Sequence, residues 1–223
     1  DGPRGPKGHD ELNQARRAGF FGWPMFVADN QAYRAFDHAT GTLGAAFDPA
    51  RPINASRLNT GARELPPAQP AWIFYPYDGS REFPALDAPG GRTACAGPVY
   101  HFDAELRSAT KFPACFDDCL FVYEWSRHWI QCVRLGPEGE LDALERFLPD
   151  VSFVRPVDLA FGPEGALYVL EYGTTWGVNE DARLVRLDYH AGNRRPVARG
   201  AGRDNVGRAP LTATFSSAAS VDP

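Results

Sequence analysis

The sequence predicts an all-β fold from three observations: its density of turn-forming residues, the strand-like pattern of its apolar residues and an internal repeat. The 223 residues include 22 glycines and 20 prolines. So many helix-breaking residues argue against a helical bundle and favour short strands joined by turns. Hydrophobic residues make up 43% of the chain and charged residues 23%, which predicts a packed core rather than wholesale disorder.

The repeat consists of two apolar, aromatic segments that lie 47 residues apart. Residues 120–125 (LFVYEW) match residues 167–172 (LYVLEY), and each segment reads as a mostly buried strand with a Glu at the same place. Further on, residues 133–135 recur as residues 185–187, so each unit continues with another strand. A strand-rich unit of about 40–50 residues is the period of a β-propeller blade. A β-sandwich with coincidental similarity is the alternative.

Two nearly identical turns accompany the repeat. Residues 136–139 and 162–165 both read GPEG, in which Pro presets the turn and Gly accepts a positive φ. Each turn is therefore expected to join neighbouring strands, with residues 158–161 and 167–170 forming one hairpin. Residues 71–75 (AWIFY) predict a further strand.

The C-terminal part has a different composition. Residues 196–209 read as a linker, and residues 210–223 begin a new pattern. There Leu211, Ala213 and Phe215 alternate with polar residues, which predicts one strand followed by a Ser-rich turn.

Charge and motifs narrow the classes of function. The net charge of −5 gives no general attraction to nucleic acid, and no apolar run approaches the roughly 20 residues of a transmembrane helix. The chain contains no G-x-S-x-G, nucleotide-binding glycine loop or H-E-x-x-H, so these enzyme classes lose support.

The cysteines predict an exported protein. Cys115 and Cys119 flank Phe-Asp-Asp, a spacing that suits a small disulfide loop better than a zinc knuckle. A local disulfide would place the protein outside the reducing cytosol, as a secreted, periplasmic or cell-surface protein.

Two segments carry candidate binding chemistry. Near the N-terminus, a Gly- and Pro-rich loop with Asp10, Glu11 and Asn13 offers carbonyls and carboxylates to a hard cation such as Ca²⁺, and an ordinary acidic turn is the alternative. Later in the chain, Arg155 and Asp158 bring a cation and a carboxylate to one loop end, for which a structural ion pair is the competing interpretation.

Several motifs resemble the glucose/sorbosone dehydrogenase family. They are residues 5–13 (GPKGHDELN), 21–24 (FGWP), 93–100 (TACAGPVY), 155–165 (RPVDLAFGPEG) and 167–173 (LYVLEYG). The resemblance covers about residues 1–195 and implies a six-bladed β-propeller that oxidises sugars with pyrroloquinoline quinone (PQQ) and Ca²⁺. About three to four of the blades would be present. Residues 210–223 resemble the first strand of the PKD-type domain that follows the propeller in multidomain secreted members.

The resemblance also implies site residues. The carbonyls of Gly5 and Pro6 correspond to ligands of the PQQ-bound calcium, although another register places Gly2 and Pro3 there. Thr93 falls where the family has a hydroxyl that contacts the quinone. Arg155 falls at an arginine that pairs with PQQ carboxylates, a task that suits a bidentate guanidinium.

Two further positions depart from the family pattern. Ser126 stands at the family's cofactor-binding Lys, with Arg127 next to it, which leaves the identity of the second cation open. The catalytic His belongs to an early blade, expected before Asp1, and none of the five histidines matches its motif. The catalytic base therefore stays unassigned, and we expect the isolated chain to be catalytically silent.

The resemblance thus predicts PQQ- and calcium-dependent oxidation of a sugar or related polyol, with an electron acceptor that the sequence does not identify. The alternative is a non-catalytic secreted propeller that binds carbohydrate or protein. A third interpretation is a scaffold module whose PKD-like tail attaches it to a surface. Fold alone does not decide among these functions.

Overall fold

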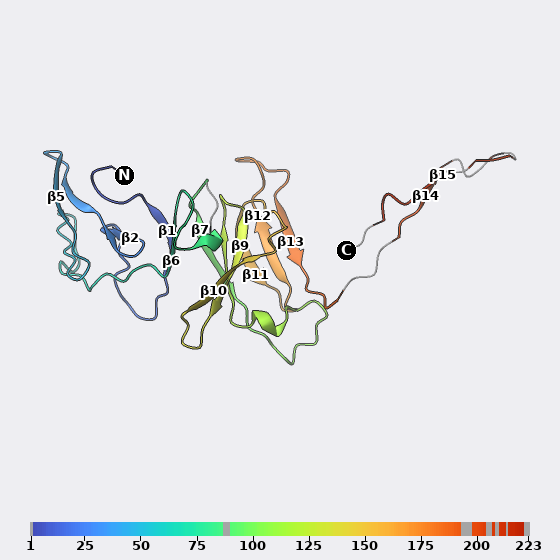
Figure 1. Ribbon diagram of the computed structural model, residues 1–223, viewed down its shortest axis with the longest axis horizontal. Coiled ribbons are helices and arrows are strands. Elements are labelled where there is room, and N and C mark those ends of the chain that lie inside the picture. Colours follow the sequence, from blue (N-terminus) through green and yellow to red (C-terminus); the bar gives the residue numbers. More distant parts are fainter. Residues whose placement is uncertain are drawn as a thin grey trace.

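The computed structural model describes residues 2–86, 90–192, 198–203, 207, 210–212 and 214–220. Within these residues the regular structure is β apart from two 3-10 turns, η1 (Pro84–Leu86) and η2 (Ala114–Phe116), which confirms the predicted all-β class. The strands of the described part form separate sheets that follow one another along the molecule without closing into a barrel or ring (Figure 1). Neither helical turn has the length or the apolar character to cross a membrane.

Two neighbouring sheets carry the sequence repeat. The first is an antiparallel meander of β7 (Ala94–Val99), β8 (Leu120–Glu124), β9 (Trp129–Leu135) and β10 (Leu141–Phe147). The second contains β11 (Pro156–Phe161), β12 (Leu167–Glu171) and β13 (Arg183–Leu187) in the same order. The repeated segments form the second strand of each sheet, and the downstream repeat lies in the third strand. The structural equivalence that the repeat predicts is therefore confirmed.

The two GPEG turns join strands as expected. The Gly139 N–H donates to the Gly136 carbonyl at 2.8 Å, and the Gly165 N–H donates to the Gly162 carbonyl at 2.8 Å. Gly139 and Gly165 have φ of 77° and 79°, the left-handed conformation that favours glycine. One turn connects β9 to β10 and the other connects β11 to β12, so the same local sequence serves different places in the two sheets.

The two middle strands of the β7–β10 sheet, β8 and β9, are buried on both faces. Alternate residues of β8 and β9 enter one core with residues of β11 and β12, namely Phe121, Tyr123, Ile130, Cys132, Leu159, Leu167 and Val169. The intervening residues enter a second core with β6 (Ile73–Pro76), namely Val122, Trp129, Val133, Ile73 and Tyr75. This arrangement explains why β8 and β9 read as almost continuous apolar runs, since both alternating sets of side chains are buried.

The N-terminal part adds a third sheet and two small hairpins. β1 (His9–Leu12) pairs antiparallel with β6, which confirms the strand predicted near residues 71–75. Between them, β2 (Phe26–Val27) pairs with β3 (Gln31–Ala32), and β4 (Arg34–Asp37) pairs with β5 (Thr42–Ala46). β1 contacts β7, and β7 contacts β11, so the first strands of three successive sheets are neighbours.

The C-terminal segment extends away from the sheets (Figure 1). β15 (Thr214–Ser216) forms where the alternating pattern predicts a strand, and a turn closed by the Ser220 N–H and the Ser217 carbonyl follows. Its partner, β14 (Ala201–Arg203), lies inside the segment interpreted as a linker, and both strands are exposed throughout. Residues 193–197, which include the predicted boundary at residue 195, and residues 221–223 lie outside the described part.

The predicted disulfide between Cys115 and Cys119 is not formed, because all four cysteines are free thiols. Cys115 is exposed in η2, whereas Cys119 is buried in the core beside Cys132. The Arg134 Nη1 donates to the Cys115 carbonyl and, at 3.5 Å, to the Cys119 Sγ. The short spacing permitted a bridge, but the fold places one thiol at the surface and the other in the interior.

Candidate functional site

A cavity of about 440 Å³ lies at one edge of the two repeat-bearing sheets. Its lining consists of Thr93, Cys95, Trp125, Pro156, Val157, Tyr172 and Trp176. These residues come from the beginnings of β7 and β11 and from just beyond the ends of β8 and β12. Because the strands are antiparallel, the start of each first strand and the end of each second strand meet at the same edge. The repeat thus brings Trp125 and Tyr172, its equivalent last residues, to one cavity.

Three aromatic rings form one side of the cavity. The ring centroids of Trp125 and Trp176 are 5.1 Å apart, and each lies 5.9 Å from the centroid of Tyr172. Trp176 is 76% exposed on the loop between β12 and β13, and the Tyr172 hydroxyl accepts a hydrogen bond from the Gly177 N–H at 3.0 Å. Such a cluster can stack on a flat ring or on the apolar face of a sugar.

Asp181 holds the base of the same loop. Its Oδ2 accepts a hydrogen bond from the Thr174 N–H at 3.0 Å, and this bond holds the pKa of the Asp181 carboxyl below its usual value. The carboxylate is therefore ionised at neutral pH and fixes the loop that carries Trp176.

Arg155 supplies a cation beside the rings. Its Cζ lies 4.8 Å from the centroid of Trp125 and 5.8 Å from that of Trp176, within range of cation–π attraction. Its Nη1 donates to the carbonyls of Gly173 at 3.3 Å and Thr174 at 2.9 Å. In the described part of the chain, Nε and Nη2 of Arg155 have no hydrogen-bond partner, so both can still bind an anionic group.

Arg155 is not paired with the carboxylate that follows it. The side chain of Asp158 accepts a hydrogen bond from the Leu159 N–H at 2.9 Å, and no ion pair joins it to Arg155 within the described residues. The structural Arg–Asp pair that the sequence left open is therefore absent, and the guanidinium is held by backbone carbonyls and aromatic faces instead.

Thr93 and Ser126 form a hydroxyl pair next to the cavity. The Thr93 Oγ1 and the Ser126 Oγ are 2.8 Å apart, and Thr93 lines the cavity. Ser126 follows Trp125, whose ring lies beneath Arg155. Of the four residues predicted to contact the cofactor, Thr93 lines the cavity, and Ser126 and Arg155 lie beside it through their contacts with Thr93 and Trp125.

The repeated Glu residues position this edge of the sheets. Glu124 is fully buried, and its carboxylate accepts hydrogen bonds from the N–H groups of Thr93 and Arg127. Glu171, its equivalent, accepts the Val154 N–H at 2.8 Å and pairs with the Arg183 Nε at 2.5 Å. Each Glu thus joins the end of the second strand of its sheet to the segment that leads into the first strand of the same sheet. The sequence signal for this role was a charged residue recurring at one place in a buried strand.

Burial raises the pKa of the Glu124 carboxyl above its ordinary value, and the two N–H donors and the nearby Arg127 oppose that effect. Glu124 holds Thr93 by accepting a hydrogen bond from the Thr93 backbone N–H, and Glu124 itself does not line the cavity.

Arg127, the fourth residue predicted to contact the cofactor, lies apart from the cavity lining. Its side chain is buried at 6% exposure, and its Cζ lies 4.3 Å from the centroid of Tyr75. The guanidinium donates to five backbone carbonyls, those of Pro76, Tyr77, Asp78, Leu86 and Gly91. Arg127 therefore joins the loops between β6 and β7 and does not line the cavity.

The predicted calcium ligands also lie apart from the cavity lining. Gly5 packs so closely on Tyr33 that an added Cβ would lie 2.9 Å from Tyr33 Cδ1, and neither Gly5 nor Pro6 lines the cavity. Gly2 and Pro3, the alternative pair, are exposed.

The acidic residues of the N-terminal loop have structural partners. The Asp10 carboxylate accepts the Ala94 N–H at 2.8 Å, and the Glu11 carboxylate accepts the Ala28 N–H at 2.6 Å and the Asn13 amide at 3.1 Å. These bonds tie β1 to its neighbours, and both residues lie in a strand rather than in the loop or acidic turn that the sequence predicted.

Comparisons of the chain with protein-family models, with curated proteins and with solved structures find no match. The resemblance to the glucose/sorbosone dehydrogenase family therefore rests on the sequence motifs alone. The cavity combines aromatic faces, a hydroxyl pair and one cation with unoccupied donors. It can hold a flat ligand that carries at least one carboxylate. The sequence did not identify Trp176, for which the only signal is an aromatic residue in a turn-rich segment.

Proposed function

We propose that the aromatic cavity binds PQQ, and that the successive sheets are blades of a β-propeller that oxidises a sugar or related polyol with PQQ and Ca²⁺. The observation that carries the proposal is the gathering of Thr93, Ser126 and Arg155 around one cavity, as the family resemblance implies. The adjacent first strands of three sheets support the blade interpretation, because inner strands of neighbouring propeller blades lie side by side.

The cavity residues divide the work of holding such a ligand. The faces of Trp125 and Trp176 would stack on the planar rings, while the open donors of Arg155 suit a carboxylate. The hydroxyls of Thr93 and Ser126 would reach a carbonyl oxygen. A volume of about 440 Å³ falls within the range of small-molecule sites, roughly 300–1,000 Å³. When bound, PQQ supplies the group that accepts hydride, and the protein supplies orientation and electrostatics.

The residues that line the cavity do not fit a calcium ion. None of the residues that line the cavity carries a carboxylate, and Gly5 and Pro6 are not among them. Calcium dependence therefore rests on the sequence resemblance, and its test must be separate from the test of PQQ binding.

The second candidate is carbohydrate binding without redox chemistry. The observation that favours it is the aromatic cluster itself, since Trp125, Tyr172 and the exposed Trp176 present rings suited to the apolar face of a sugar. This function requires neither Arg155 nor a metal ion.

Tryptophan fluorescence tests both candidates. Titration with PQQ should give saturable quenching, and Arg155→Met should weaken PQQ binding by about 10- to 150-fold, the equivalent of one hydrogen bond to a charged group. Arg51→Met is the matched control, because Arg51 is exposed and its one ion pair among the described residues is with Asp48 at 3.7 Å.

Titrations with and without Ca²⁺ separate the metal from the cofactor. Saturable binding of sugars with no binding of PQQ would favour the second candidate. Binding of neither ligand, or equal PQQ affinity in wild type and Arg155→Met, would refute the assignment of this cavity.

A further inference from the structure

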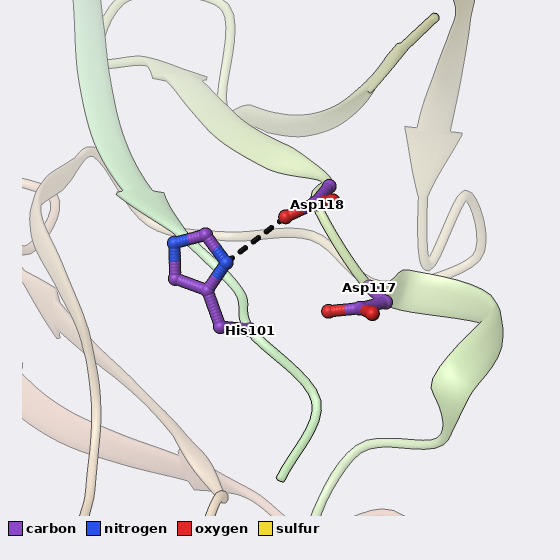
Figure 2. Close-up of side chains that lie close together, drawn as sticks. All are labelled: His101, Asp117 and Asp118. Atoms are coloured by element: carbon purple, nitrogen blue, oxygen red, sulfur yellow. Dashed lines mark hydrogen bonds and ion pairs between the residues drawn. The ribbon is translucent and has the colours of Figure 1, made fainter. Parts of the chain in front are cut away.

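A second group of chemically capable side chains lies outside the aromatic cavity. It forms where the segment after β7 meets the segment between η2 and β8. Figure 2 shows the side chains of His101, Asp117 and Asp118 turned toward one another. Their potential ligand atoms all lie within 4.8 Å of one another, and the His101 Nδ1 is 3.0 Å from the Asp118 Oδ1.

The backbone holds these three residues in place. The Tyr100 N–H donates to the Cys119 carbonyl at 2.9 Å, and the Asp118 N–H donates to the Tyr100 carbonyl at 2.8 Å. On the other side of His101, the Phe102 N–H donates to the Asp117 Oδ1 at 2.7 Å. The two segments are therefore fixed on both sides of His101, and the side chains need little rearrangement to share a ligand.

The charge of the group favours a cation. Two adjacent carboxylates face a single imidazole, and within the described part of the chain no Lys or Arg forms an ion pair with Asp117 or Asp118. All three residues are exposed, so an ion and its remaining water ligands would have access.

We propose that His101, Asp117 and Asp118 form a binding site for a divalent transition-metal ion, with Zn²⁺ as its best fit. An imidazole with two carboxylates is a mixed nitrogen and oxygen donor set, which suits zinc, whereas calcium takes oxygen ligands. Two ligands about 2.1 Å from a tetrahedral ion lie about 3.4 Å apart, close to the separation of His101 Nδ1 and Asp118 Oδ1. This site is independent of the proposed PQQ cavity.

Three protein ligands leave at least one position of a zinc ion open to water or to an added ligand. The competing interpretation is an exposed His–Asp hydrogen bond with a nearby second carboxylate, which would need no ion. The two interpretations differ in what Asp117 does, since only the metal site requires its carboxylate to act together with the other two.

Isothermal titration of the full chain with Zn²⁺ tests the proposal, in a Cys115→Ser background that removes an exposed thiol able to bind zinc. We expect one zinc ion per chain. His101→Ala should weaken binding by at least about tenfold, since even changes outside the first coordination sphere cost 10- to 100-fold. His190→Ala is the control, because His190 is also an exposed histidine but lies outside the cluster.

A second pair of variants removes charge with little change of shape. Asp117→Asn and Asp118→Asn should each weaken zinc binding, whereas Asp150→Asn, an exposed aspartate elsewhere, should not. Co²⁺ in place of Zn²⁺ should give a visible absorption band, and the His101→Ala variant should lack this band. The circular dichroism spectrum of the variant should match that of the parent chain. Equal zinc affinity in His101→Ala and His190→Ala, no effect of Asp117→Asn, or tighter binding of Ca²⁺ than of Zn²⁺ would overturn the proposal.

Discussion

Replacing Arg127 by Met should destabilise the fold strongly, because this buried guanidinium holds five backbone carbonyls. The bonds to the carbonyls of Leu86 and Gly91, at 2.7 and 2.8 Å, are buried, and Met leaves these acceptors without partners. The substitution also removes the positive charge near the buried Glu124. Removing one partner from such a buried charged network costs about 3–5 kcal/mol. In a chain of this size, that loss lowers Tm by about 10 °C.

Urea unfolding and thermal melting of Arg127→Met measure the effect, and Met retains the length and most of the packing of the side chain against Tyr75. Arg51→Met is the control, since its exposed side chain should change stability by no more than about 0.5 kcal/mol. A loss below about 1 kcal/mol for Arg127→Met would refute the structural role. Loss of PQQ quenching with unchanged stability would instead return Arg127 to the cofactor site.

Two further predictions concern titratable groups. Burial raises the pKa of Glu124 above its ordinary value of 4.5, so its contribution to stability is full below that pH and is lost as the pH rises through the raised pKa. In urea unfolding, the free energy of unfolding of the wild type should therefore fall relative to that of Glu124→Gln as the pH rises from 4.5 to 8. A rise in the relative stability of the wild type would contradict a pKa raised by burial. Burial raises the pKa of Cys132 to about 12, so maleimide at pH 8 should label the exposed Cys115 quickly and Cys132 only after unfolding. The unfolded, unreduced chain should give four reactive thiols, and a count of two would restore a disulfide.

The strands and turns were predictable because their signals are local. The segments that became β8 and β12 repeat the same apolar pattern, and each GPEG sequence supplies the Pro and Gly that its turn needs. The equivalence of the second strands followed directly from the matching sequences, although Leu170 of β12 is 44% exposed where its equivalent in β8, Tyr123, is buried.

The site was predictable only in part, because its composition depends on the direction in which each side chain points at the end of a strand. Ser126 and Arg127 are adjacent in sequence, yet Ser126 reaches Thr93 beside the cavity and Arg127 turns into the loops after β6. No local pattern distinguishes these directions.

The cysteine prediction failed for a related reason. A spacing of four residues fixes how far apart Cys115 and Cys119 lie along the chain, but Cys115 is exposed within η2 whereas Cys119, just beyond η2, enters the core. Trp176 was missed because the rings that it contacts, those of Trp125 and Tyr172 just beyond β8 and β12, come together with it only after folding.

Protection of Cys95 from a thiol reagent shows whether PQQ occupies the aromatic cavity. Cys95 lines this cavity, whereas Cys115 is exposed elsewhere and serves as an internal control in the same sample. Maleimide labelling of the folded chain, followed by peptide mass spectrometry, gives the labelling rates of Cys95 and Cys115 with and without PQQ. We expect saturating PQQ to slow the labelling of Cys95 and to leave that of Cys115 unchanged, and we expect Arg155→Met to abolish the protection. Saturable PQQ binding with an unchanged rate at Cys95 would contradict the assignment of PQQ to this cavity.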